Sequence, residues 1–128
     1  MTRVFLVDDQ ALVRAGFRLV IDSQPDMTVV GEAGDGREAL EKYDPAAVDF
    51  VITDWNMPNM SGTDLAKALR ARSDAGRTVP ILMVTARSVK EDILTAMEAG
   101  VNNYIVKPFT PQVLKEKIDA LLTAPAAS

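Results

Sequence analysis

Several residues that can bind ions or react lie at the ends of separate apolar runs of the chain. They share a position at or just after the last apolar residue of a run, and they are Asp8, Asp9, Asp54, Thr85 and Lys107. Short apolar runs with polar boundaries are typical of buried strands. Because the carboxyl ends of parallel strands lie at one edge of an open sheet, we expect these side chains to converge there.

The chemistry of these side chains is that of phosphoryl transfer. The Asp54 carboxylate could attack a phosphoryl group and form an acyl phosphate. Asp8 and Asp9 could hold a magnesium ion, which prefers carboxylate oxygens and cancels the repulsion between two anions. Lys107 could neutralise the phosphoryl oxygens, and the Thr85 hydroxyl could donate a further hydrogen bond.

Each of these residues also has an ordinary structural interpretation. A single Asp after a strand is usually a turn or capping residue, and a single Lys is usually a solvated charge. The combination is more specific, because adjacent Asp8 and Asp9 repel each other and Asp54 would add a third negative charge. Such a cluster indicates a bound cation.

Composition narrows the class of protein. The chain has 128 residues, which suits one domain, and it has neither Cys nor His. Disulfides, thiolate metal sites and the commonest general base are therefore excluded, whereas carboxylates suit hard ions such as Mg²⁺. The net charge of -4 argues against direct nucleic acid binding. The first residues resemble neither a secretory signal nor a spanning segment, so we expect a cytoplasmic protein without membrane insertion.

Predicted strands alternate with helical patterns along the chain. The strands are expected at 3–7, 27–33, 48–53, 80–84 and 103–106. Five strands alternating with five helices imply right-handed crossovers and a parallel sheet that is covered on both faces. We therefore predict a doubly wound α/β domain over residues 1–123, followed by a tail at 124–128 that resembles a cut linker.

The helical patterns have recognisable starts and apolar positions. Capping residues with a matching residue one to three positions later are Asp35 with Glu38, Ser88 with Glu91, and Thr110 with Pro111. The first helical pattern carries Leu12, Ala15, Phe17, Leu19 and Val20. A later stripe, closed by Gly100, consists of Val89, Ile93, Ala96 and Met97.

With Asp8 and Asp9, Asp54, Thr85 and the dipeptide of Lys107 and Pro108, nearly the whole chain resembles the receiver domains of two-component response regulators. The resemblance implies a flavodoxin-like (βα)5 fold with strand order 2-1-3-4-5. It also implies that Asp54 accepts a phosphoryl group from a histidine kinase and that the Lys107–Pro108 bond is cis. The implied ligands of Mg²⁺ are Asp9, Asp54 and the main-chain carbonyl of Asn56, with Asp8 assisting.

The two halves of the chain resemble different branches of this family. Residues 7–40 are similar to receivers attached to DNA-binding transcription factors of the LuxR and NarL type. From Asp49 onward the chain resembles stand-alone chemotaxis regulators of the CheY type, through runs such as 54–60, 83–86 and 106–110. A mosaic, whether natural or engineered, is one interpretation.

The resemblance also implies a switch and an output. Thr85 would move toward the phosphoryl group, the aromatic ring of Tyr104 would turn inward, and the face formed by helix four, strand five and helix five would change. Asn56 and Arg87 are expected to set the phosphate lifetime, although chemotaxis regulators often carry an acid in place of Arg87. The residues expected at the partner surface are Ser88, Lys90, Glu91, Tyr104, Lys115 and Lys117.

Other functions remain open from the sequence. An aspartate-nucleophile phosphatase of the haloacid dehalogenase type would use Asp54 and Lys107, but it usually has an acid where Asn56 stands. An FMN-binding module would need a phosphate loop after the first strand, where Asp8 and Asp9 would repel phosphate. We predict a phosphorylatable receiver whose output is protein binding, of the flagellar motor switch kind. The alternative is a receiver fragment of a DNA-binding transcription factor.

Overall fold

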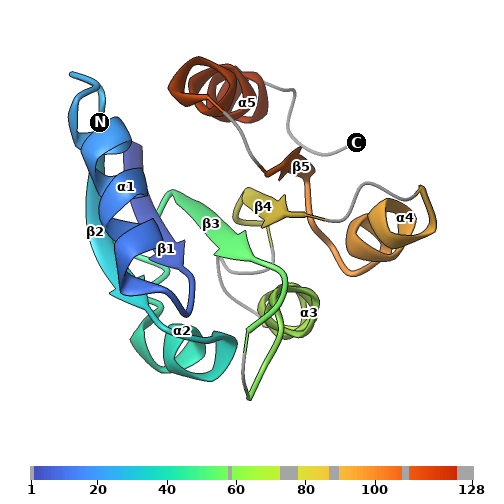
Figure 1. Ribbon diagram of the computed structural model, residues 1–128. Coiled ribbons are helices and arrows are strands. Elements are labelled where there is room, and N and C mark those ends of the chain that lie inside the picture. The colour runs from blue at the N-terminus through green and yellow to red at the C-terminus, as the bar shows by residue number, and fades with distance from the viewer. Residues whose placement is uncertain (1, 58, 73–77, 87–89, 108–109, 124–128) are drawn as a thin grey trace.

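The structure is a computed structural model that describes residues 2–57, 59–72, 78–86, 90–107 and 110–123. Its centre is a parallel five-stranded sheet with strand order β2-β1-β3-β4-β5, which confirms the predicted order (Figure 1). The strands are β1 (Thr2–Val7), β2 (Met27–Ala33), β3 (Phe50–Asp54), β4 (Ile81–Thr85) and β5 (Asn103–Val106). The helices are α1 (Ala11–Asp22), α2 (Gly36–Lys42), α3 (Gly62–Arg70), α4 (Lys90–Glu98) and α5 (Pro111–Thr123).

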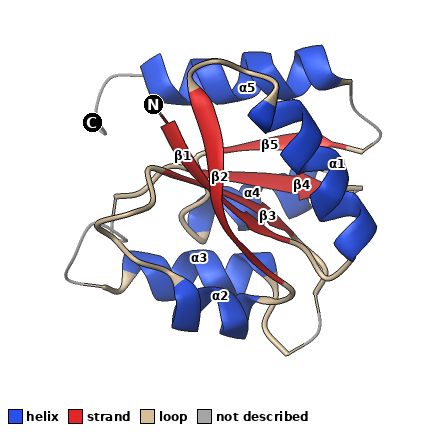
Figure 2. Cartoon of the chain, turned by 90° about the vertical axis from the view of Figure 1, so that its left-hand side faces the viewer, coloured by secondary structure: helices blue, strands red, loops and turns tan. Residues whose placement is uncertain are grey.

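Helices cover both faces of the sheet, as Figures 1 and 2 show. Successive strand residues point to opposite faces, so Phe5 and Val7 belong to one apolar core and Val4 and Leu6 belong to the other. The first core is completed by residues of α2, α3 and α4, and the second by residues of α1 and α5. A strand whose two faces are both buried needs apolar side chains on both sides, which explains why the central strands appear in the sequence as short apolar runs.

Two central strands are shifted toward the C-terminus relative to the prediction: β3 begins at Phe50 rather than at Val48, and β4 begins at Ile81 rather than at Pro80. β3 ends at Asp54 and β4 ends at Thr85, each one residue beyond the expected end. The reason is pairing: Asp54 lies opposite Val84, and the Trp55 N–H donates to the Val84 carbonyl at 3.2 Å. Pairing within the sheet therefore fixes the backbone of Asp54 and Thr85, the two residues predicted to take part in phosphoryl transfer.

The predicted helix starts agree with the structure where it describes them. The Asp35 carboxylate accepts from the Glu38 N–H at 2.8 Å, and the Thr110 hydroxyl accepts from the Val113 N–H at 3.2 Å. Gly100 has a φ of 107°, which favours glycine at the end of a helix. The cap at Ser88 and the stripe position Val89 lie outside the described residues.

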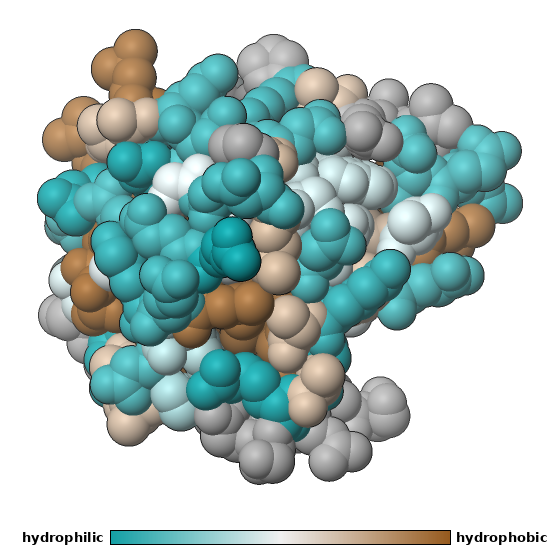
Figure 3. All heavy atoms as spheres, turned by 90° about the horizontal axis from the view of Figure 1, so that it is seen from below, coloured by the Kyte–Doolittle hydropathy of each residue, from teal (hydrophilic) through white to brown (hydrophobic). Residues whose placement is uncertain are grey.

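Some residues of the helical patterns do not face the core. In α1, Phe17 and Ile21 are buried, whereas Leu12 and Leu19 are 86% and 75% exposed, and Met97 of α4 is 42% exposed. The face that includes α2 and α3 is mostly hydrophilic, with apolar residues in separate patches (Figure 3). Within the described ranges, no helix combines the length and the apolar character needed to cross a bilayer.

Candidate functional site

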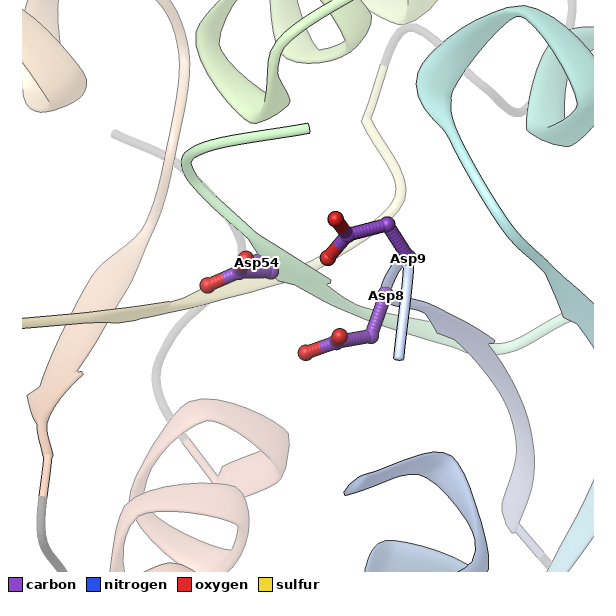
Figure 4. A group of neighbouring side chains, drawn as sticks. All are labelled: Asp8, Asp9 and Asp54. Atoms are coloured by element: carbon purple, nitrogen blue, oxygen red, sulfur yellow. The ribbon is translucent and has the colours of Figure 1, made fainter. Parts of the chain in front are cut away.

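Three carboxylates meet at the carboxyl edge of the sheet. Asp8 and Asp9 directly follow β1, and Asp54 ends the neighbouring strand β3. Each contributes one oxygen to a group whose members all lie within 4.8 Å of one another, and the side chains project toward a common space (Figure 4). This arrangement places up to three negative charges around one point.

Asp8 is the buried member of the group. Asp8 is 3% exposed. The Asp8 N–H donates to the Ala33 carbonyl at 3.0 Å, and the Asp8 Oδ1 accepts from the Gln10 N–H at 2.9 Å. Its Oδ2 is buried and has no hydrogen-bond partner among the described residues. Burial, with a smaller contribution from the Asp54 charge, raises the pKa of Asp8 above its usual value.

These features fit a divalent cation. A buried oxygen without a donor is costly unless something positive binds it, and the other two groups also offer carboxylate oxygens. Magnesium takes oxygen ligands from a small number of carboxylates and keeps several waters. Asp8, Asp9 and Asp54 therefore form a donor set suited to Mg²⁺ rather than to a softer metal.

Lys107 supplies the positive charge of the site. Its Nζ lies 3.2 Å from Asp54 Oδ1, and the two side chains are 32% and 12% exposed. The Lys107 N–H donates to the Thr85 carbonyl at 2.8 Å, so the end of β4 positions the residue after β5. Thr85 is buried, at 2% exposed. The lysine is thus aimed at the carboxylate predicted to react.

Hydrogen bonds that were not predicted from the sequence hold the loop between β3 and α3. Asn59 has a φ of 65°, and its Nδ2 donates to Asp35 Oδ2 at 2.7 Å. The Gly36 N–H donates to the Met60 carbonyl at 3.2 Å. Asn tolerates positive φ better than most residues, so the residue type at position 59 was the one feature of the sequence that could have indicated this turn. These bonds attach the loop that carries Asn56, an exposed residue, to the start of α2.

Gly62 was also missed as a site residue. A Cβ built at this position would lie 2.2 Å from the Asp54 carbonyl oxygen and 3.0 Å from the Met83 side chain. The Gly62 N–H donates to the Trp55 carbonyl at 2.9 Å. The start of α3 therefore approaches the backbone of Asp54 more closely than any side chain allows, and glycine is required by space.

The expected switch residue Tyr104 and the described partner-surface residues lie on β5, α4 and α5. Tyr104 is half-buried on β5, pairs in register with Met83, and has the Lys117 Nζ 5.5 Å from its ring centroid. Lys90 and Glu91 are exposed at the start of α4. Lys115 is exposed on α5. Arg87, Ser88 and Pro108, with the predicted cis bond, lie outside the described residues.

Replacing Asp8 by Asn is expected to stabilise the metal-free chain. Because the pKa of Asp8 is raised on folding, the folded state holds this proton to higher pH than the unfolded state does. Stability therefore falls as pH rises from the unfolded pKa, about 3.9, through the folded pKa, and it stays lower above that window. Asp8→Asn removes this loss and should weaken Mg²⁺ binding at least about tenfold.

Urea unfolding at a series of pH values with a chelator measures the first effect, and repetition with Mg²⁺ measures the second. The native chain should gain stability from Mg²⁺ and the Asp8→Asn variant should gain little. A variant that is less stable than the native chain at neutral pH without metal would contradict the repulsion inferred for this cluster.

Comparison with known proteins agrees with this geometry. Residues 4–119 match the response regulator receiver domain family. The chain is 46% identical over 121 residues to chemotaxis protein CheY1 of Helicobacter pylori, an alignment that covers 94% of this chain and 96% of CheY1. This alignment spans both halves of the chain.

Solved structures of response regulator receivers have the same fold as this chain. The chemotaxis response regulator CheY4 of Vibrio cholerae superposes with a TM-score of 0.85 and 34% identity, covering 94% of this chain and 98% of that one. The signal receiver domain of NarL from Mycobacterium tuberculosis has a TM-score of 0.85 and 27% identity, covering 96% and 98%. The fold is shared by both branches.

Chemotaxis protein CheY1 is more similar to this chain in sequence than the NarL receiver is. Identity is 46% to CheY1 and 27% to the NarL receiver. Proteins of the CheY type are normally signalling proteins rather than enzymes, and a receiver of this type implies a kinase and a downstream target. The chain belongs to the response regulator receiver domain family and is a CheY-like, phosphorylation-switched receiver of chemotaxis signalling.

Proposed function

We propose that Asp54 is the phosphoryl acceptor of this receiver. The observation that carries the proposal is the Asp54 carboxylate, which lies 3.2 Å from the Lys107 Nζ and within 4.8 Å of two further acids. An Asp54 oxygen attacks the phosphorus of a phosphohistidine on a histidine kinase. The phosphorus–nitrogen bond breaks, the imidazole leaves with a proton, and an acyl phosphate forms on Asp54.

The other residues of the site make this attack possible. Asp9, Asp54 and the main-chain carbonyl of Asn56 would hold Mg²⁺, with Asp8 assisting. The ion would supply positive charge that offsets the repulsion between the carboxylate and the incoming phosphoryl group. Lys107 stabilises the phosphoryl oxygens by charge, and the Thr85 hydroxyl donates to one of them once the acyl phosphate has formed.

We assign the lifetime of the acyl phosphate to Asn56 and Arg87. Both stand two residues beyond a site residue, Asp54 and Thr85 respectively, and would flank the path of a hydrolytic water. Asn56 is a poor general base, so hydrolysis should be slow. The chain would therefore catalyse its own phosphorylation and slow dephosphorylation, and the phosphatase alternative is disfavoured by the same residue.

The output follows from a second conformation. We propose that Thr85 and Tyr104 couple the phosphoryl group to the surface of α4, β5 and α5, which binds a protein target such as the flagellar motor switch in the cytoplasm. The cation–π contact of Lys117 with Tyr104 ties the ring to that surface. A Tyr104→Ala variant that keeps its phosphorylation-dependent affinity for the target would exclude this role. A transcription-factor receiver spanning 1–123 is the second candidate, supported by residues 7–40.

The proposal predicts magnesium-dependent phosphorylation by a small donor. With Mg²⁺ and acetyl phosphate, the intact mass should rise by about 80 Da, one phosphoryl unit. Trp55, the one tryptophan of the chain, is 7% exposed and adjacent to Asp54, so its fluorescence should report the same event. A chelator should abolish both signals. An unchanged mass with Mg²⁺ and donor present would reject the proposed function.

A further inference from the structure

Arg14 of α1 connects the acidic cluster to the edge of the sheet. Its Nη1 donates to the main-chain carbonyl of Asp8, and its Nε donates to Glu32 Oε1 of β2 at 3.2 Å. The Arg14 side chain is 20% exposed and that of Glu32 is 25% exposed. Arg18, one turn further along α1, binds the other Glu32 oxygen through its Nη2 and is 52% exposed.

The bond to Asp8 acts on the peptide that joins Asp8 to Asp9. The Asp8 N–H is already held by the Ala33 carbonyl at 3.0 Å, and the Asp8 carboxylate accepts from the Gln10 N–H at 2.9 Å. Arg14 adds a fixed partner for the carbonyl on the other side of the residue. Because the peptide is planar, the direction of this carbonyl fixes the orientation of the bond into Asp9.

Asp9 is the member of the cluster that most needs such a constraint. It is exposed, whereas Asp8 is buried and Asp54 ends a paired strand. An exposed side chain on an unsupported turn would sample several directions, and a metal ligand that must be ordered on binding costs affinity. Figure 4 shows the Asp9 carboxylate projecting toward the space beside Asp54.

We propose that Arg14 is a positioning residue of the magnesium site, which holds the peptide between Asp8 and Asp9 so that the Asp9 carboxylate faces Asp54. Glu32 supports this role, because its carboxylate offsets the guanidinium charge and orients the Arg14 side chain. The inference rests on the proposed function, since it assigns a role to Arg14 in binding the ion that phosphorylation requires.

A positioning role for Arg14 and a purely electrostatic role predict opposite changes in Mg²⁺ affinity when Arg14 is removed, so the two roles can be distinguished by experiment. A guanidinium beside an anionic pocket opposes the entry of a second cation, so its removal should tighten Mg²⁺ binding if charge alone matters. If Arg14 positions Asp9, its removal should weaken Mg²⁺ binding. Outer residues that orient metal ligands typically change metal affinity by roughly tenfold or more.

The experiment titrates Mg²⁺ into the chelator-treated chain without a phosphodonor. Trp55 fluorescence and calorimetry give the dissociation constant for the native chain and for Arg14→Met. We expect the constant to rise roughly tenfold in the variant. Arg18→Met is the matched control, because it removes a cation that also binds Glu32 but has no described bond to Asp8. The Mg²⁺ dissociation constant of Arg18→Met should differ from that of the native chain by less than about twofold, because solvent and salt screen an exposed charge.

A second measurement reads the positioning directly in the absence of metal. The amide ¹⁵N shift of Asp9 responds to hydrogen bonding at the preceding carbonyl of Asp8. The Asp9 amide shift of Arg14→Met should differ from that of the native chain, and the shift of Arg18→Met should be unchanged. If Arg14→Met fails to fold, Arg14→Lys takes its place: it keeps the charge but cannot bridge Asp8 and Glu32, so its dissociation constant should still rise.

The possible failures are distinguishable. A native chain that does not bind Mg²⁺ would reject the proposed function together with this inference. A native chain that binds Mg²⁺, with equal or tighter binding in Arg14→Met, would reject the positioning role alone. An unmoved Asp9 amide in Arg14→Met, or an unchanged constant in Arg14→Lys, would do the same.

Discussion

Asp54→Asn is expected to abolish phosphoryl uptake completely. The substitution keeps the shape of the side chain at the end of β3 but replaces the carboxylate with an amide, which is not a nucleophile. It also removes the ion pair with Lys107 and one oxygen of the acidic cluster. Under conditions in which the native chain gains about 80 Da, the mass of the variant should stay unchanged.

Asp49→Asn is a matched control for this substitution. Asp49 immediately precedes β3 and its carboxylate pairs with Arg3 at 2.9 Å, so it resembles Asp54 in side-chain type and in having a cationic partner. It lies at the opposite end of the strand, and its variant should take up phosphate as the native chain does. A phosphoryl group found on Asp54→Asn would move the acceptor to Asp8 or Asp9.

Gly62→Ala is expected to have the largest effect of any small substitution on stability. The added Cβ would lie 2.2 Å from the Asp54 carbonyl oxygen, and a backbone atom in a paired strand cannot move away cheaply. We expect a loss of about 3 kcal/mol in the free energy of unfolding, measured with urea. Displacement of the Asp54 backbone should also lower the rate of phosphorylation by acetyl phosphate.

The control uses the same substitution at Gly16. This glycine lies inside α1, and apart from its chain neighbours and the backbone of its own helix an added Cβ would have no described atom within 4 Å. Gly16→Ala should therefore stabilise the chain by about 0.5 to 1 kcal/mol, because alanine favours the helix. If both variants had the same stability as the native chain, the close approach of Gly62 to Asp54 would not constrain the fold.

The acidic cluster shows how the fold supports a site that opposes its own stability. Mutual repulsion and the unpartnered Asp8 oxygen both disfavour the metal-free state. The two apolar cores on either side of the sheet offset this cost, and a bound cation would relieve it. Stability and phosphorylation are therefore expected to depend on the same ion.

The sequence alone determined the kind of site and the elements that carry it. Short apolar runs that end in Asp8, Asp54 and Lys107 predicted one reactive edge, because strand ends converge in a parallel sheet. Local signals also predicted β2 and β5 to the residue, and the caps at Asp35 and Thr110. The strand order came from the family resemblance, since local patterns do not specify which strands are neighbours.

The tertiary structure alone decided how precisely the site is built. The extension of β3 to Asp54, the exposure of Leu12, the contact of Arg14 with Asp8 and the approach of Gly62 to Asp54 all had to be seen in three dimensions. The physical reason is that periodicity and capping act between residues a few positions apart. Pairing, burial and close backbone approach depend on elements that meet only after the chain has folded.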